Sequence, residues 1–150
     1  RGLMRTFLAA ALLLLGACGD GDPVGTGFVL SLRAAQARWE SSGIESYEIT
    51  VRRLCFCGFV EPVRVRVVDG TIVSRTVVPS GEPVPLDYAG YIPDVPGLFA
   101  IVEEAAVAAD ELEASFDAVY GFPTEISIDG DEIAVDDEIV FLTEALTPIP

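Results

Sequence analysis

Three cysteines are the side chains in this sequence best suited to covalent chemistry, and Cys18 has the most informative surroundings. It ends the small-residue segment LGAC, which follows an apolar run over residues 7–15, and Arg5 precedes that run. A positive start, an apolar core of this length and small residues before a cleavage point are typical of an export signal. A cysteine at that point is typical of a bacterial lipoprotein. We therefore expect that residues 1–17 are removed and that Cys18 is acylated.

Lipid chains on Cys18 would make a bilayer the first partner of the protein. Each buried CH₂ group contributes about 0.8 kcal/mol, and more than one chain gives lasting attachment. The apolar run is less than half of the about 20 residues that a membrane-spanning helix needs. Two alternatives are an ordinary secretory signal with an unrelated cysteine and an N-terminal helix of the folded domain. The lipoprotein interpretation places the chain in the cell envelope, on a periplasmic or outer membrane face.

Cys55 and Cys57 are the remaining thiols, and one residue separates them. In a strand their Cα atoms lie about 6.6 Å apart, near the upper limit for a disulfide, and a bend at Gly58 can close that gap. In an oxidising compartment we expect the two to form a structural disulfide. A redox-active bond and a soft-metal site for an ion such as Cu(I) are the alternatives. The helix-start context of C-x-x-C redox motifs is absent.

Six carboxylates occur within ten residues near the C-terminus, beginning at Asp129. Calcium binds such oxygen ligands, but the spacing does not fit the twelve-residue EF-hand loop. The bland interpretation is a solvated acidic turn, and the sharper one is a surface for a partner or a weakly held divalent cation. The candidate interaction surface consists of Asp131, Glu132, Asp136, Asp137 and Glu138.

The composition excludes several function classes. The chain has no histidine, which removes Ser-His-Asp, Cys-His and His-zinc chemistry. Its formal net charge of −15 argues against nucleic-acid binding, which needs a basic surface. No motif in the chain has the specificity of a catalytic signature. We therefore expect no enzymatic activity, no cofactor and no dedicated metal site.

The charges are unevenly distributed along the chain. Residues 19–75 carry 7 arginines and 7 acidic residues, whereas residues 76–150 carry 17 acidic residues and no basic one. An acidic face that keeps the protein soluble explains this split, as does a surface for a cation or a basic partner. Because bacterial lipid surfaces are commonly anionic, we expect the arginine-bearing half, with Arg64 and Arg66, to face the bilayer. We also expect those arginines to pair with carboxylates of the second half.

Periodicity predicts two helices and six strands in one α+β domain. We expect a lipoprotein signal over 1–17, a flexible tether over 18–30 and the domain over 31–150. The fold would be an antiparallel sheet of about six strands with two helices on one face, built as a tandem helix-three-strand repeat. The predicted elements are a helix over 32–42 capped by Ser31, strands over 47–52 and 63–68, a tight turn at Asp69-Gly70, a strand over 71–78, a loop over 79–94, a helix after Asp94, strands over 112–117 and around 126–128, a turn at Asp129-Gly130 and a strand over 138–146.

A series of short motifs, in order along the chain, resembles the bacterial family called domain of unknown function 6174. The motifs are Trp39, Tyr47, Cys55-Phe56-Cys57, Val63–Gly70, Leu98-Phe99, Phe116-Asp117, Gly121-Phe122-Pro123, Ile128-Asp129 and Asp136-Asp137-Glu138. The resemblance covers roughly Ala34 to Leu146. This sequence departs from the family pattern at Phe116, where tyrosine is common, and at Gly58, where a proline often follows the second cysteine. It implies this architecture and an exported lipoprotein, and no chemistry.

Three classes of function stay open from the sequence. The first is a membrane-anchored module that binds an envelope protein or a small ligand through the sheet face or the 79–94 loop. The second is an envelope redox or metal-handling protein that uses Cys55 and Cys57. The third, by analogy of fold alone, is a secreted inhibitor or an envelope-assembly factor.

Overall fold

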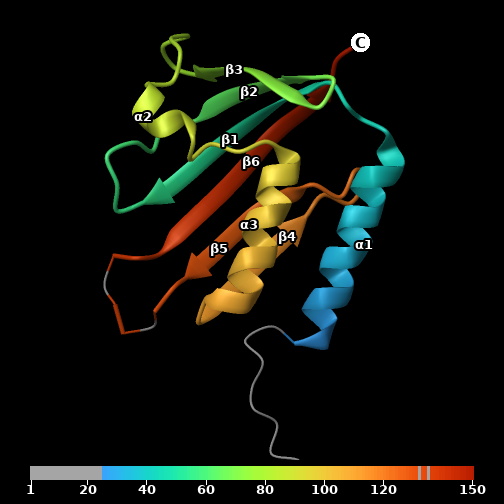
Figure 1. Cartoon of the computed structure of the whole chain (residues 1–150), viewed down its shortest axis with the longest axis vertical. Helices are drawn as coiled ribbons and strands as arrows, with labels where there is room; N and C mark the ends of the chain where they lie inside the picture. The colour runs from blue at the N-terminus through green and yellow to red at the C-terminus, as the bar shows by residue number, and fades with distance from the viewer. Residues whose placement is uncertain (1–24, 132, 135) are drawn as a thin grey trace, which may run out of the picture.

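A computed structural model of the chain describes residues 25–131, 133–134 and 136–150, and the expected signal segment lies outside these ranges. The described part is an α+β fold with one six-stranded sheet in the order β3-β2-β1-β6-β5-β4 (Figure 1). All neighbouring strands are antiparallel. The elements are α1 (Thr26–Ser42), β1 (Tyr47–Cys55), β2 (Val63–Val68), β3 (Thr71–Val77), α2 (Leu86–Ala89), α3 (Val95–Ala108), β4 (Glu111–Phe116), β5 (Pro123–Asp129) and β6 (Ile139–Pro148).

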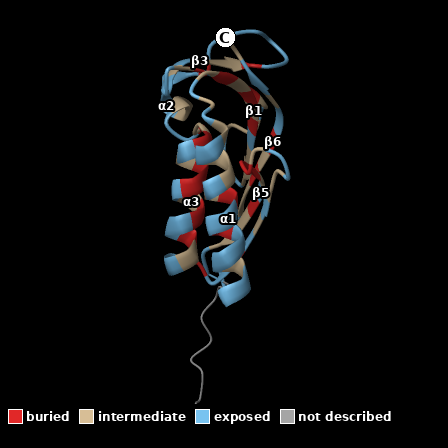
Figure 2. Cartoon of the chain, turned by 90° about the vertical axis from the view of Figure 1, so that its right-hand side faces the viewer, coloured by how far each residue is buried: buried red, intermediate tan, exposed pale blue. Residues whose placement is uncertain are grey.

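The core lies between the sheet and the two long helices. Apolar residues at every second strand position are buried on one face. The paired residues Ile49 and Val65 show this in the first half, and the fully buried Ile126 shows it in the second. Helices α1 and α3 both cover this face, and no described helix covers the other (Figure 2). The expected α+β fold with a six-stranded antiparallel sheet is confirmed.

The start of α1 differs from the sequence prediction. The helix begins at Thr26, after Gly25, so Ser31 lies inside it and does not cap it. The last five residues of the expected 18–30 tether are therefore helical. The physical reason is Phe28, which packs against the core and extends the buried stripe of the helix upstream. The predicted end at Gly43 is confirmed by its left-handed φ of 63°.

The connections are predicted well in one place and wrongly in two. Asp69 and Gly70 form the expected tight turn, with φ of 48° and 71°. Asp129-Gly130 forms no such turn, because β5 ends at Asp129 and residues 130–138 connect it to β6. The expected 79–94 loop contains the short helix α2. The predicted cap of α3 is confirmed, since the Gly97 N–H donates to Asp94 Oδ1 over 2.9 Å.

The two halves repeat in element order but not in space. Each half is a long helix followed by three strands, with α2 added before the second. Following the antiparallel neighbours across the sheet shows that β1 and β4 run in opposite directions. A rotation that superimposed one set of three strands on the other would exchange the faces of the sheet. Because both helices lie on the same face, the two halves are not copies of one unit.

Candidate functional site

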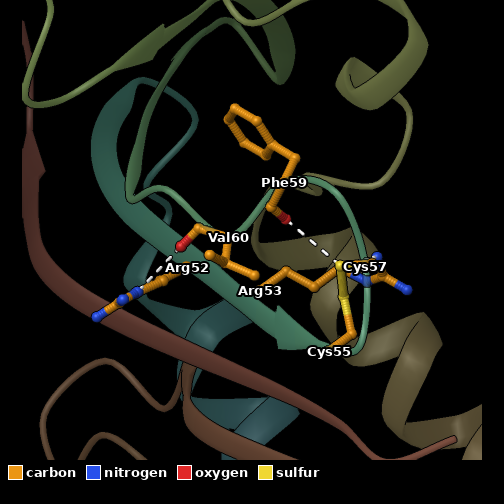
Figure 3. The surroundings of a disulfide bond; sticks show 6 residues. All are labelled: Arg52, Arg53, Cys55, Cys57, Phe59 and Val60. Atoms are coloured by element: carbon orange, nitrogen blue, oxygen red, sulfur yellow. Dashed lines mark hydrogen bonds between the residues drawn. A yellow bond between two sulfur atoms is a disulfide. The ribbon is translucent and has the colours of Figure 1, made fainter. Parts of the chain in front are cut away.

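The two downstream cysteines form a disulfide at the end of β1 (Figure 3). Their Cα atoms are 5.2 Å apart, shorter than an extended strand allows. The Cys57 N–H donates to the Cys55 carbonyl oxygen over 2.8 Å, so the chain folds back at Phe56. The closing bend therefore lies one residue before Cys57, and not at Gly58 as we expected.

Polar groups surround one sulfur of this bond. Arg53 Nη1 lies 3.6 Å from Cys57 Sγ, and the Phe59 carbonyl oxygen lies 3.5 Å from the same sulfur. A disulfide sulfur has no proton to donate, so the second approach is a contact and not a hydrogen bond. The Arg53 guanidinium also lies over the Tyr91 ring, 5.2 Å from its centroid, which holds it in place.

The bond lies at the surface. Cys57 is exposed and Cys55 is half-buried. The Phe56 side chain between them is 82% exposed, which is unusual for an aromatic residue that packing alone would place. A hollow of about 320 Å³ opens beside Cys55, bordered by Phe56 and by Asp136 and Glu138 of the 130–138 connection.

This hollow is where the structure places part of the predicted acidic surface. Asp136 and Glu138 border the hollow beside Cys55, whereas Asp131 Oδ1 accepts from the Ile133 N–H over 3.0 Å within its own turn. Asp137 is half-buried, and Glu132 lies outside the described residues. No three metal-ligating side chains converge among the residues that the structure describes. The weak cation site therefore stays a prediction.

The sheet face that carries no helix is divided by charge. The strand order places the first three strands on one side and the last three on the other. Arg52, Arg64 and Arg66 extend from β1 and β2 at positions that alternate with the core. Arg66 Nη1 pairs with Glu48 Oε1 over 3.1 Å. This arginine thus pairs within its own half, and not with a second-half carboxylate as we expected.

The other side of this open face is acidic. It carries Glu111 and Glu113 of β4, Glu125 of β5 and Glu144 of β6, all exposed. We call these four residues the acidic sheet face. The register places Glu113 opposite Ser127 and Glu125 opposite Ser115, so the two glutamates are diagonal neighbours about 7–8 Å apart between Cα atoms. A small hollow of about 80 Å³ is bordered by Glu113 and Ser115 of β4 and by Glu125 and Ser127 of β5.

Sequence reasoning did not single out the acidic sheet face. The signal was present, since Glu111 and Glu113 alternate with the buried Leu112. That alternation shows that they point away from the core. Bringing Glu125 and Glu144 beside them depends on pairing between strands, which the sequence does not display.

The expected orientation toward a membrane stays a prediction. Figure 1 places the start of α1 at the lower end of the molecule and strands β2 and β3 at the upper end. Cys18 itself lies outside the described residues. None of the described helices has the length and apolar character needed to cross a bilayer.

Comparison with known proteins gives one match. The family of unknown function DUF6174 matches residues 31–148, nearly the whole described domain. No curated protein and no solved structure matches the chain significantly.

Proposed function

Because the chain belongs to the DUF6174 family, a family of unknown function, its role must be argued from its own surface. We propose that it is an exported lipoprotein, anchored through Cys18, whose domain binds a basic polypeptide partner on the acidic sheet face. Inhibition or assembly of another envelope protein would be a particular form of this binding.

The observation that carries the binding proposal is the sorting of charge on the open face. Strands β4, β5 and β6 contain no basic residue, so Glu111, Glu113 and Glu125 have no cation on their neighbouring strands, whereas Glu144 lies at the border with β1. Like charges that are cross-strand neighbours destabilise each other. A cationic partner relieves this repulsion and gains attraction, and a field of one sign also speeds its association. The serines of the hollow supply hydroxyls that can donate to or accept from the same partner.

The anchor proposal has support of a different kind. Cys18 is seven residues before Gly25, the residue that directly precedes α1. A flexible segment of that length has a root-mean-square span of roughly 15 Å. Acylation at Cys18 would therefore hold the domain within reach of proteins on the same membrane.

The test is site-specific photo-cross-linking in intact membranes. A photoreactive side chain is placed at Ser127 on the acidic half of the open face, at Ser74 on the basic half, and at the exposed Ala100 of α3. We expect a cross-link to a basic protein at Ser127 that weakens as salt rises, and none at Ser74 or Ala100. Cys18→Ser should leave the domain folded and release it from the membrane fraction.

Either of two results would reject a part of the proposal. Equal cross-linking from all three positions would remove the acidic sheet face as the binding surface. A Cys18→Ser form that stays in the membrane fraction would remove the lipid anchor and leave the binding surface intact.

A further inference from the structure

The disulfide at the end of β1 is chemically unsymmetrical. Cys57 Sγ has a guanidinium nitrogen of Arg53 3.6 Å away, while no charged group is within hydrogen-bond reach of Cys55 Sγ among the described residues. A thiolate leaves a disulfide faster when it is stabilised, and a neighbouring arginine stabilises it. Breaking the bond therefore favours negative charge on Cys57. The Phe59 carbonyl oxygen, now only in contact with that sulfur, would accept a hydrogen bond from the Cys57 thiol once that thiol is protonated.

Access does not single out one sulfur, since Cys57 is exposed, Cys55 is half-buried, and a hollow is lined by both residues. The hollow bordered by Phe56, Asp136 and Glu138 opens beside Cys55, so an incoming thiolate can reach Cys55 Sγ. The exposed Phe56 ring offers an apolar contact, and the two carboxylates favour a chain segment with basic residues. Attack at Cys55 with departure of Cys57 uses both the hollow beside Cys55 and the Arg53 guanidinium beside Cys57.

A purely structural role explains this bond poorly. A disulfide stabilises a fold mainly by closing a loop in the unfolded chain, and the effect grows with loop length. Here the sequence separation is 2, close to the minimum, so the restraint on the unfolded chain is small. Exposed disulfides are also the ones most open to exchange.

We propose that Cys55–Cys57 is a thiol–disulfide exchange site that oxidises a dithiol in a basic polypeptide segment. A substrate thiolate attacks Cys55 Sγ, the Cys55–Cys57 bond breaks, and its electron pair leaves on Cys57 Sγ beside Arg53. The second substrate thiolate then attacks the substrate sulfur of the mixed disulfide and releases Cys55 as a thiolate. The substrate loses two electrons and forms its own disulfide, the pair gains two electrons, and both cysteine thiolates take up the protons that the substrate thiols released. This activity is independent of the proposed binding on the acidic sheet face.

The first test measures how fast a peptide dithiol reduces the oxidised protein, with intact mass after acid quenching and alkylation as the readout. The peptide carries Cys-x-x-Cys flanked by arginines, and a second peptide is flanked by glutamates. Arg53→Gln should slow reduction about fivefold, and Arg53→Lys should retain most of the rate, because the departing Cys57 thiolate needs the charge. Arg52→Gln is the matched control: it removes the same charge from the adjacent residue, whose side chain bonds to the Val60 carbonyl on the other side of the strand (Figure 3). Its rate should stay within twofold of the wild type.

The second test identifies the sulfur that is attacked. A peptide with one cysteine traps the mixed disulfide, and fragmentation mass spectrometry locates it; we expect at least tenfold more adduct on Cys55 than on Cys57. Adduct mainly on Cys57, equal slowing by Arg52→Gln and Arg53→Gln, or a disulfide that millimolar peptide dithiol leaves intact would each overturn the proposal. Equal rates with the two flanked peptides would overturn the assignment of a basic substrate.

Discussion

The first three strands and the last three pack against the helices in the same way but present different surfaces to solvent. Both sets bury alternate apolar side chains against the helices, as Ile49 and Ile126 show with no exposed surface in either case. On the opposite face the first set carries arginines and the second carries only acidic charge. Core positions are constrained by close packing, whereas open positions tolerate almost any polar residue. The fold therefore does not require this charge difference, and its explanation should be sought in the function of the protein.

The largest expected effect tests the part that the halves share. Ile49→Ala and Ile126→Ala should each lower the free energy of unfolding by about 3 kcal/mol, because each leaves a cavity in a fully buried layer. Urea unfolding of both variants checks this, with Val73→Ala, 55% exposed on β3, as the control expected to change stability by less than about 0.5 kcal/mol. A small loss in only one of the two buried variants would show that the halves do not share one cooperative core.

Much of this shared part could be predicted from the sequence. Alternation located β1 and β2, and Asp69-Gly70 has the residue types that a two-residue turn requires. The start of α1 was missed because Phe28 directly follows a glycine-rich stretch, residues 19–27, that looks like a tether. The Asp129-Gly130 turn was predicted wrongly because the same dipeptide here begins a longer acidic connection.

The candidate sites were less predictable, for a physical reason. The Cys55–Cys57 bond follows from local spacing, and sequence reasoning found it. Placing Asp136 and Glu138 beside Cys55 depends on the pairing of β1 with β6, which are far apart along the chain. Long-range register is set by the packing of the whole domain, and a single sequence does not reveal it.

A smaller effect is expected at the junction of the halves. Tyr47 of β1 accepts a hydrogen bond from the buried Val95 N–H at the start of α3, over 3.1 Å, and its ring meets Trp39 of α1 edge-on. Tyr47→Phe should cost about 2 kcal/mol, because it leaves that N–H without a partner. Urea unfolding at pH 7 measures the loss, and a change below about 0.5 kcal/mol would show that this bond does not tie the halves together.

The same tyrosine gives a pH dependence. Burial raises the pKa of Tyr47 well above its usual value, and the nearby Asp94 adds to this while the bond to Val95 opposes it. Because the pKa is higher in the folded state, the stability that Tyr47 contributes is intact below pH about 10 and is lost as the pH rises above that value. The free energy of unfolding should therefore fall more steeply at alkaline pH in the wild type than in Tyr47→Phe, and equal slopes would contradict this assignment.

The charge difference itself is tested most directly by titration with a hexa-arginine peptide at low ionic strength. Glu113→Gln with Glu125→Gln removes two charges from the acidic sheet face, and Glu40→Gln with Glu104→Gln removes two exposed charges from the helical layer. We predict that the first pair raises the dissociation constant about fivefold and that the second changes it less than about twofold, since position and not net charge governs binding. Equal weakening by the two pairs would mean that the peptide senses only overall acidity, and would contradict a binding surface on β4 to β6.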